Sequence, residues 1–302
     1  MSRQARRVGV IGAGTMGNGI AQVFAVAGYP VIMRDLSQPA LDRGLSTIAN
    51  SISRLVARGK CTAADREQAL GRIRATTELK ELADCDLVVE AILENFDLKA
   101  RVIQELDQVC RPDTIFATNT SSISVTRIAA ASSLPDRVIG MHFFNPVPIM
   151  QLVEIIRALQ TSDEVCSAVV DLTEAIGKRA RVSKDSYGFV VNRVLIPMVN
   201  EAINCVYEGL ATPDDVDAMM KLGANHPMGP LSLADLIGLD IVLDIMGTLY
   251  GGFDDPKYRP SPLLKQMCDA GYLGRKTGKG FFSYEEGPAV QPKAQLANAR
   301  PA

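Results

Sequence analysis

Gly12-Ala13-Gly14-Thr15-Met16-Gly17 is the stretch of sequence on which the reading of the fold depends. The run Arg6–Ile11 before it is typical of a buried strand, and a helical pattern follows it to about Ala27. A second strand-like run, Pro30–Arg34, then leads to an acid, Asp35. This order of strand, glycine turn, helix, strand and acid predicts a dinucleotide-binding unit.

Each residue of the glycine-rich turn has a physical task in such a unit. Gly12 allows the tight turn, Gly14 lets the backbone approach a pyrophosphate, and Gly17 lets the helix pack closely against the strand. The pyrophosphate would rest on the helix N-terminus beside Thr15 and Met16, where amide groups and the helix dipole favour an anion.

Asp35 and its neighbour Arg34 bear on which nucleotide is bound. The carboxylate of Asp35 would bind the adenosine ribose hydroxyls and repel a 2′-phosphate, which favours NAD over NADP. Arg34 leaves NADP open as the alternative, because a cation at this position could accept a 2′-phosphate.

Short apolar runs alternate with helical segments along the first 185 residues. Strands are expected over 72–76, 86–91, 114–118, 137–141, 151–157 and 178–182, and the clearest helices over 38–59, 96–109 and 162–176. Such alternation predicts an α/β fold of Rossmann type, with a doubly wound, mostly parallel sheet. A short helix starting at Thr62 would make the helix over 38–59 one arm of an inserted helical hairpin.

The pattern becomes all-helical in the carboxyl-terminal third. Helices are expected over 189–209, 213–222, 230–249 and 262–270. The length of 302 residues also suggests two domains, at roughly 150 residues each. We expect an NAD-binding domain over 1–186, an all-α substrate domain over 187–285 and a disordered tail over 286–302.

His142, one of two histidines, is the strongest catalytic candidate. The strand-like runs on either side of it mirror each other about position 148, so antiparallel pairing would place His142 opposite Glu154. An imidazole beside a carboxylate is held in one tautomer and becomes a better base. The alternative is a core histidine that caps a turn.

Two loops at the carboxyl ends of predicted strands carry polar side chains, and ligands collect there in this fold. One loop holds Glu94, with Lys99 a turn and a half further on, and the other is Asn119-Thr-Ser-Ser122. A hydroxyl in the second loop could bond a reacting oxygen, although helix capping is an equal alternative.

Two further candidates lie on helices. Ser51, Arg54 and Arg58 share one face of the helix over 38–59 and could hold phosphates, although a solvated helix face is the simpler explanation. Asn192 stands in the first turn of the second domain, close to the boundary where interdomain pockets form.

Composition excludes several classes of function. The formal net charge is −2 and no basic block extends beyond Arg6-Arg7, so nothing favours nucleic acid. The cysteines are scattered without a Cys-x-x-Cys, which argues against zinc and favours reduced thiols in the cytoplasm. Residues 8–33 are uncharged and long enough to span a bilayer, but their glycines and proline argue against a membrane span.

The chain resembles the short-chain 3-hydroxyacyl-CoA dehydrogenases, especially the bacterial 3-hydroxybutyryl-CoA dehydrogenases, over about residues 6–284. The motifs that carry the resemblance are Val10-Ile-Gly-Ala-Gly-Thr-Met-Gly17, Asn119-Thr-Ser-Ser122, His142-Phe-Phe-Asn-Pro-Val-Pro148, Gly188-Phe-Val-Val-Asn-Arg193, Pro227-Met-Gly-Pro230 and Gly274-Arg-Lys-Thr-Gly-Lys-Gly280. It implies reversible NAD-dependent oxidation of an (S)-3-hydroxyacyl-CoA, with 3-hydroxybutyryl-CoA expected, to the 3-ketoacyl-CoA. It also implies a place in fatty acid and butanoate metabolism, and a homodimer formed through the helical domain.

The resemblance also implies roles for individual residues. His142 would be the catalytic base, oriented by Glu154, while Ser121 and Asn192 would hold the substrate oxygen. Ser51 would contact CoA, as would Arg58, where the family has lysine. The family's cofactor contacts fall on Asp35, Glu94, Lys99, Ser121, Asn145 and Lys276.

One departure from the family pattern concerns the domain junction. The family usually has Pro-Gly-Phe before its domain-joining helix, whereas this chain has Tyr187-Gly188-Phe189. Three other functions also remain open: an NADP-dependent acetoacetyl-CoA reductase, a sugar-acid dehydrogenase that acts on free hydroxy acids, and an NAD-binding protein without activity.

Overall fold

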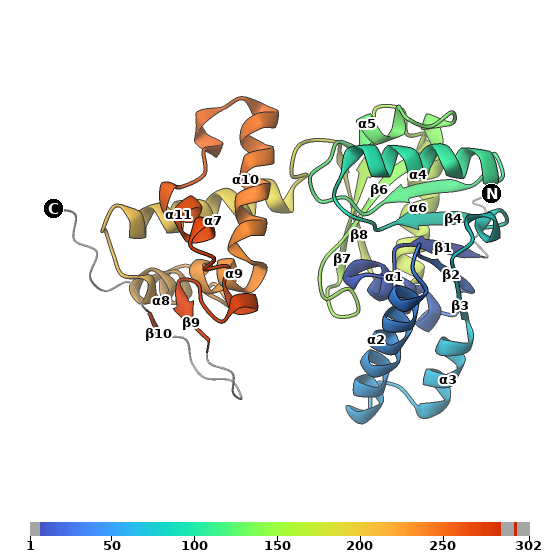
Figure 1. The fold of residues 1–302 in the computed structure, drawn as a ribbon, viewed down its shortest axis with the longest axis horizontal. Helices are drawn as coiled ribbons and strands as arrows, with labels where there is room; N and C mark the ends of the chain where they lie inside the picture. The colour runs from blue at the N-terminus through green and yellow to red at the C-terminus, as the bar shows by residue number, and fades with distance from the viewer. Residues whose placement is uncertain (1–6, 285–292, 295–302) are drawn as a thin grey trace. The chain divides into compact units, whose positions relative to one another are not determined.

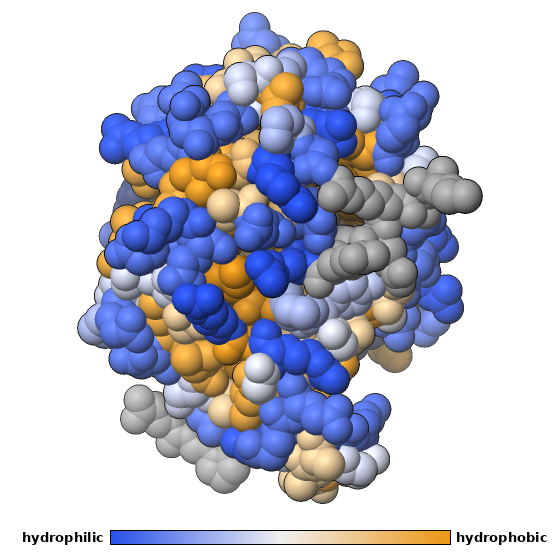
Figure 2. All heavy atoms as spheres, turned by 90° about the vertical axis from the view of Figure 1, so that its right-hand side faces the viewer, coloured by the Kyte–Doolittle hydropathy of each residue, from blue (hydrophilic) through white to orange (hydrophobic). Residues whose placement is uncertain are grey.

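The computed structural model describes residues 7–284 and 293–294. Contacts along the chain divide it after Ser186 into two compact units, the second beginning at Tyr187. In the part of the chain that is described, no helix is both long and apolar enough to cross a membrane. One face of the molecule is mostly hydrophilic, with hydrophobic side chains in patches between the polar ones (Figure 2).

An eight-stranded sheet forms the centre of the first unit, in the order β3-β2-β1-β4-β5-β6-β7-β8 (Figure 1). Neighbouring strands are parallel except β6 and β7, which are antiparallel. The predicted mostly parallel sheet is thus confirmed. The strands are β1 (Val8–Ile11), β2 (Val31–Arg34), β3 (Ile73–Thr76), β4 (Leu87–Glu90), β5 (Ile115–Thr118), β6 (Val138–Phe143), β7 (Leu152–Arg157) and β8 (Arg179–Lys184).

Helices connect these strands and cover the sheet. Two of them, α2 and α3, form the expected helical hairpin, while the short helix α5 was not expected. Ser37 caps α2, and Thr62 makes a capping box with Asp65 at the start of α3. The helices are α1 (Thr15–Val26), α2 (Gln38–Ala57), α3 (Ala63–Gly71), α4 (Phe96–Val109), α5 (Val125–Ala129) and α6 (Asp163–Ala175), with short 3₁₀ turns η1 (Leu79–Leu82) and η2 (Pro135–Arg137).

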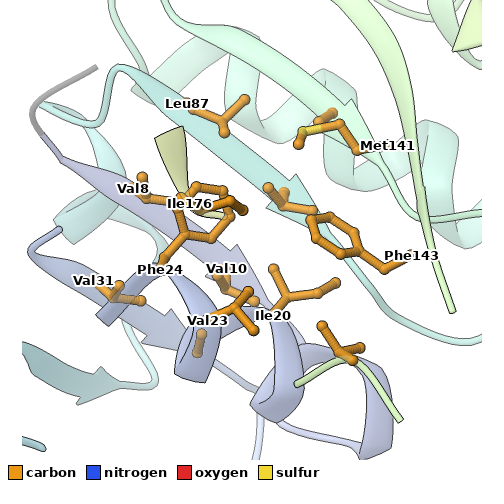
Figure 3. Packing of buried hydrophobic residues seen from close by; sticks show 14 of the residues in the cluster. Val8, Val10, Ile20, Val23, Phe24, Val31, Leu87, Met141, Phe143 and Ile176 are labelled. Atoms are coloured by element: carbon orange, nitrogen blue, oxygen red, sulfur yellow. The ribbon is translucent and has the colours of Figure 1, made fainter. Parts of the chain in front are cut away.

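The core of the first unit fixes α1 against the sheet. Ile20 and Phe24 of α1 belong to one buried cluster with Val10 of β1 and with Met141 and Phe143 of β6 (Figure 3). Each such side chain contributes about 1.5–3 kcal/mol when fully buried. The glycine-rich turn before α1 and the end of β6 are therefore anchored to the same rigid core.

The second unit consists almost entirely of helices around a separate core. Its elements are α7 (Val191–Tyr207), α8 (Pro213–Gly223), α9 (Pro230–Ile237), α10 (Leu239–Phe253), η3 (Pro256–Tyr258), α11 (Pro262–Asp269), η4 (Arg275–Thr277), β9 (Phe282–Ser283) and β10 (Lys293–Ala294). Within the expected tail, residues 293–294 pair with β9 as an antiparallel strand. The other residues of the expected tail lie outside the described residues.

The prediction of one helix over 230–249 is wrong, because Gly238 divides it into α9 and α10. Gly238 has φ = 105°, a left-handed conformation that a helix cannot include. Its missing side chain also leaves room for the Asp240 carboxylate and the Lys276 side chain, which would lie 2.9 and 3.2 Å from a Cβ. Apolar residues continue across the break, so their pattern alone did not reveal it.

Candidate active site

The glycine-rich turn leaves open space where a pyrophosphate would approach the protein backbone. A Cβ at Gly12 would lie 2.6 Å from the Ala91 carbonyl oxygen, and one at Gly17 would lie 1.8 Å from the Gly12 carbonyl oxygen. A Cβ at Gly14 would meet nothing within 4 Å. Packing of the protein therefore requires Gly12 and Gly17 but not Gly14, and the empty space at Gly14 fits the close approach of a pyrophosphate.

The start of α1 is suited to an anion. Gly14 is the N-cap and offers no side-chain hydrogen bond to the first turn, and that turn contains no acidic residue. Thr15 is exposed and Met16 is half-buried at this helix start. The backbone amides and the helix dipole thus favour a phosphate here, so this part of the chain fits NAD.

Asp35 braces the same turn from the end of β2. Its Oδ2 accepts a hydrogen bond of 2.8 Å from the Ala13 amide, and its Oδ1 accepts one of 3.2 Å from the Ser37 amide. The neighbouring Arg34 donates from Nε to the Thr77 carbonyl oxygen at 3.3 Å. Asp35 therefore both shapes the turn and presents a carboxylate at the carboxyl edge of the sheet.

His142 and Glu154 face each other across β6 and β7, as the mirror symmetry of the sequence predicts. Nδ1 of His142 lies 2.8 Å from Oε2 of Glu154, and the two residues are 5% and 3% exposed. The Phe144 ring lies beside the imidazole, with 4.5 Å between the ring centroids. A hydrogen bond from Nδ1–H to a carboxylate fixes the tautomer in which Nε2 carries the lone pair.

The end of β6 is tied to the loop that carries Ser121. The Phe143 amide donates to Oδ1 of Asn119 at 2.9 Å, and β5 and β6 are adjacent parallel strands. This brings the loop after β5 and the residues after His142 to one edge of the sheet. Asn145 lies on that edge and is exposed.

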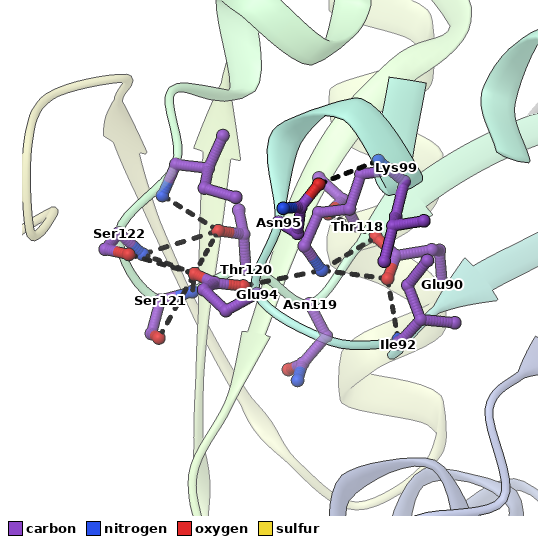
Figure 4. A network of polar contacts seen from close by, with 12 residues as sticks. Glu90, Ile92, Glu94, Asn95, Lys99, Thr118, Asn119, Thr120, Ser121 and Ser122 are labelled. Carbon is purple, nitrogen blue, oxygen red and sulfur yellow. Dashed lines mark hydrogen bonds and ion pairs between the residues drawn. The ribbon is translucent and has the colours of Figure 1, made fainter. Parts of the chain in front are cut away.

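Glu94 organises the loop that contains Ser121 (Figure 4). Its Oε1 accepts hydrogen bonds from the Thr120 hydroxyl at 2.6 Å, the Ser121 amide at 2.9 Å, and the Ser122 amide and hydroxyl, both at 3.0 Å. Burial opposes ionisation, but Lys99 and these donors together hold the pKa of the Glu94 carboxyl below its usual value of 4.5.

Behind Glu94 lies a buried ion pair between Lys99 and Glu90, an acid that sequence reasoning missed. Nζ of Lys99 lies 2.8 Å from Oε1 of Glu90 and 3.4 Å from Oε2 of Glu94, and the Lys99 side chain has no exposed surface. Glu90 also accepts a hydrogen bond of 2.8 Å from the Thr118 hydroxyl and one of 2.7 Å from the Ile92 amide. An acid closing the apolar strand β4 was the signal that could have drawn attention to Glu90.

Lys178 is a second residue that sequence reasoning missed. Its Nζ donates to the carbonyl oxygens of Val147 at 2.6 Å and Met150 at 2.7 Å, and so clamps the turn between β6 and β7. Burial lowers the pKa of the Lys178 ammonium. Nothing in the sequence pattern distinguishes this lysine from one at an exposed strand end.

The remaining predicted residues lie on other elements. Ser51 and Arg54 lie on α2, with Ser51 half-buried and Arg54 exposed, and Arg58 is the exposed C-cap residue. Asn192 lies in the first turn of α7, in the second unit. Lys276, in η4 of the same unit, forms an ion pair with Asp240.

Tyr187, the departure from the family pattern, packs within the second unit. Its ring meets Phe253 edge-on, with 5.3 Å between the centroids. A Cβ at Gly252 would lie 2.4 Å from the Tyr187 ring, so the tyrosine fills the space that this glycine leaves. Tyr187 is therefore accommodated by α10 without displacing Gly188, whose φ of 69° requires glycine.

Comparison with known proteins places the chain in a family. A family model for the 3-hydroxyacyl-CoA dehydrogenase NAD-binding domain matches residues 7–186, and one for the C-terminal domain of the same enzymes matches residues 188–284. The probable 3-hydroxybutyryl-CoA dehydrogenase of Deinococcus radiodurans is 55% identical over 278 residues, which cover 92% of this chain and 100% of that protein. The 3-hydroxybutyryl-CoA dehydrogenase of Bradyrhizobium diazoefficiens is 50% identical over 284 residues, which cover 94% of this chain and 97% of that protein.

A solved structure agrees with these matches. The crystal structure of (S)-3-hydroxybutyryl-CoA dehydrogenase PaaH1 from Ralstonia eutropha has a TM-score of 0.92 and 53% identity, covering 94% of this chain and 100% of that one. The resemblance seen in the sequence motifs is thereby confirmed. This chain belongs to the 3-hydroxyacyl-CoA dehydrogenase family and is an oxidoreductase with an amino-terminal NAD-binding domain.

Proposed function

We propose that this enzyme interconverts (S)-3-hydroxybutyryl-CoA and acetoacetyl-CoA, with NAD as the redox partner. The observation that carries the proposal is the buried pair of His142 and Glu154, 2.8 Å apart. The pair lies in the same sheet as β1, and the glycine-rich turn that follows β1 is shaped for a dinucleotide. The relatives named for 3-hydroxybutyryl-CoA support this substrate.

The proton of the 3-hydroxyl group passes to His142 in the proposed reaction. Nε2 accepts it, and Glu154 stabilises the imidazolium that forms. Bound NAD would accept the hydride that leaves C3. In the reverse direction the same nitrogen returns the proton, so the one pair serves both directions. A positioned base of this kind contributes about 10²–10⁴-fold to the rate.

Ser121 is proposed to donate a hydrogen bond to the substrate oxygen as negative charge develops on it. The loop that holds Ser121 lies at the carboxyl edge of β5, next to the edge of β6 where His142 lies. A preorganised donor at such an oxygen is among the larger contributions to catalysis. Asn192, in α7, is the second proposed donor.

Ser51 and Arg54 of α2, with the C-cap residue Arg58, are proposed to hold the phosphates of CoA. The two arginines are exposed and present cations on a rigid helix. If this is right, a CoA thioester will be a far better substrate than the free acid. That expectation separates the proposal from a dehydrogenase of free hydroxy acids.

The direct test measures consumption of NADH by the purified chain with acetoacetyl-CoA, in parallel with free acetoacetate and with NADPH. We expect turnover with NADH and the thioester, and little with free acetoacetate. Turnover preferring NADPH would instead support the acetoacetyl-CoA reductase, and equal turnover of the free acid would overturn the proposed substrate.

The second unit is proposed to join two copies of the chain. Its helices and the turns after them expose large apolar side chains that a monomer would leave in water, namely Tyr207, Leu210, Met219, Leu222, Leu236 and Ile241. Apolar surface of this kind marks protein interfaces. A homodimer through these helices would cover it.

A further inference from the structure

The loop around Ser121 is held by one oxygen atom rather than by bonds within the loop alone. Oε1 of Glu94 receives the amides of Ser121 and Ser122 and the hydroxyls of Thr120 and Ser122, all at 3.0 Å or less. The contact from the Ser121 hydroxyl is the longest of the set, at 3.4 Å. Glu94 thus holds the loop mainly through its amides and through the neighbours of Ser121.

Glu94 is held in turn by a charge that has no exposure to solvent. Nζ of Lys99 reaches Oε2 of Glu94 at 3.4 Å, and it reaches both carboxylate oxygens of Glu90, at 2.8 and 3.1 Å. Glu90 is 1% exposed. Because the Lys99 side chain has no exposed surface, its charge acts on the loop through Glu94.

A buried ion pair is weak evidence for stability, because removing two charges from water costs about as much as their attraction returns. It does fix geometry when its remaining hydrogen bonds are satisfied. Here Thr118 and the Ile92 amide complete the shell of Glu90 at 2.8 and 2.7 Å. Glu90 stands at the carboxyl end of β4, and its partner Thr118 stands at the carboxyl end of β5, where the loop begins.

We propose that Glu90, Lys99 and Glu94 form a positioning relay that sets the place of Ser121, an inference that rests on the role proposed for Ser121 above. Glu90 is the fixed end, because it closes β4. Lys99 transfers that position to Glu94, and Glu94 sets the loop. In this account Glu94 and Lys99 act on the reaction through Ser121, and Glu90 is a positioning residue that no sequence motif indicated.

The first variant is Glu94→Gln, which keeps the shape of the side chain and removes its charge. The relay predicts a fall in kcat of about 10- to 100-fold, since small displacements of a reacting group cost that much. Turnover is compared at saturating NADH, so a change in the dissociation constant for NADH does not enter the comparison. If Glu94 acted only by binding the cofactor, the dissociation constant would rise and kcat would be preserved, which would overturn the relay.

A double-mutant cycle then tests whether the effect passes through Ser121. Ser121→Ala alone should lower kcat, and adding Glu94→Gln should lower it little further, because both changes remove one function. Additive losses would show that Glu94 acts on turnover by another route and would contradict the relay.

A measurement independent of turnover separates failure of the relay from failure of the proposed function. Amide hydrogen exchange over residues 119–124 should speed up in Glu94→Gln, because the Ser121 and Ser122 amides lose an ionised acceptor. It should also speed up in Glu90→Gln, because Lys99 loses the buried partner that fixes its position beside Glu94. Glu105→Gln, an exposed acid on the same helix α4, is the matched control and should leave exchange unchanged. Unchanged exchange in the Glu94 variant would overturn the relay whether or not the wild-type chain turns over acetoacetyl-CoA.

Discussion

At the scale of single residues, the buried carboxylate beside His142 supports the proposed role of this histidine as a base over that of a core histidine. Glu154 is 3% exposed and its oxygen lies 2.8 Å from Nδ1. In that setting the carboxylate holds the ring in one tautomer and lowers the free energy of the imidazolium.

Replacing Glu154 by glutamine should therefore lower kcat by about 10²–10⁴-fold, because the amide neither stabilises the imidazolium nor selects the tautomer. NADH binding, followed by fluorescence, should stay within about threefold of wild type. A variant with wild-type kcat would show that the pair is structural.

Lys178 offers a second residue-scale prediction, on stability. Its folded pKa is lowered by burial from 10.5, so between the folded pKa and 10.5 the unfolded chain binds more protons than the native chain. The free energy of unfolding contributed by this lysine therefore rises with pH across that window. At neutral pH, Lys178→Met should already be destabilised by about 1–3 kcal/mol, because two carbonyl groups lose their donor.

Urea unfolding of wild type and Lys178→Met at several pH values checks this. The free energy of unfolding of wild type should exceed that of Lys178→Met by a larger amount as the pH approaches 10.5. Lys184→Met, at the exposed end of β8, is the control for simple loss of a lysine. A difference in free energy of unfolding that shrinks with rising pH would contradict a lowered pKa of Lys178 in the folded chain.

At the scale of elements, the turn before α1 combines two kinds of glycine. A Cβ at Gly17 would lie 1.8 Å from the Gly12 carbonyl oxygen, whereas a Cβ at Gly14 would meet nothing within 4 Å. One glycine is required for packing, and the other is proposed to leave room for the cofactor.

Gly14→Ala should therefore fold with nearly wild-type Tm, since its φ of −66° suits alanine, while the Kd for NADH rises about tenfold or more, or about 1.4 kcal/mol. Gly17→Ala should lower Tm by several degrees, because overpacking costs about 1–3 kcal/mol. Calorimetry gives the Tm of each variant, and titration with NADH gives its Kd. Equal effects of the two substitutions on stability would contradict the distinction.

At the scale of the whole molecule, the second unit is proposed to carry the dimer interface. Leu222 of α8 is 87% exposed, and Leu159 of the first unit is 91% exposed. Light scattering at micromolar concentration should give a dimer for wild type and for Leu159→Glu, and a shift towards monomer for Leu222→Glu. A monomeric wild type would contradict the proposal.

Sequence predicted the parts of this molecule that depend on periodic patterns. The parallel sheet follows from its apolar runs, and the facing of His142 and Glu154 follows from the symmetry of the two strands. The break at Gly238 was missed because apolar residues continue across it. Glu90 and Lys178 were missed because their importance comes from partners distant in sequence, such as Thr118 and Val147, and only the fold brings these together.

The central claim is that the pair of His142 and Glu154 carries the proton transfer, and His142→Gln tests it most directly. The measurement is kcat with NADH and acetoacetyl-CoA, beside the Kd for NADH in the same preparation. The account predicts a loss of at least about 10²-fold in kcat with the Kd for NADH nearly unchanged. A variant that turns over at the wild-type rate would show that the base lies elsewhere.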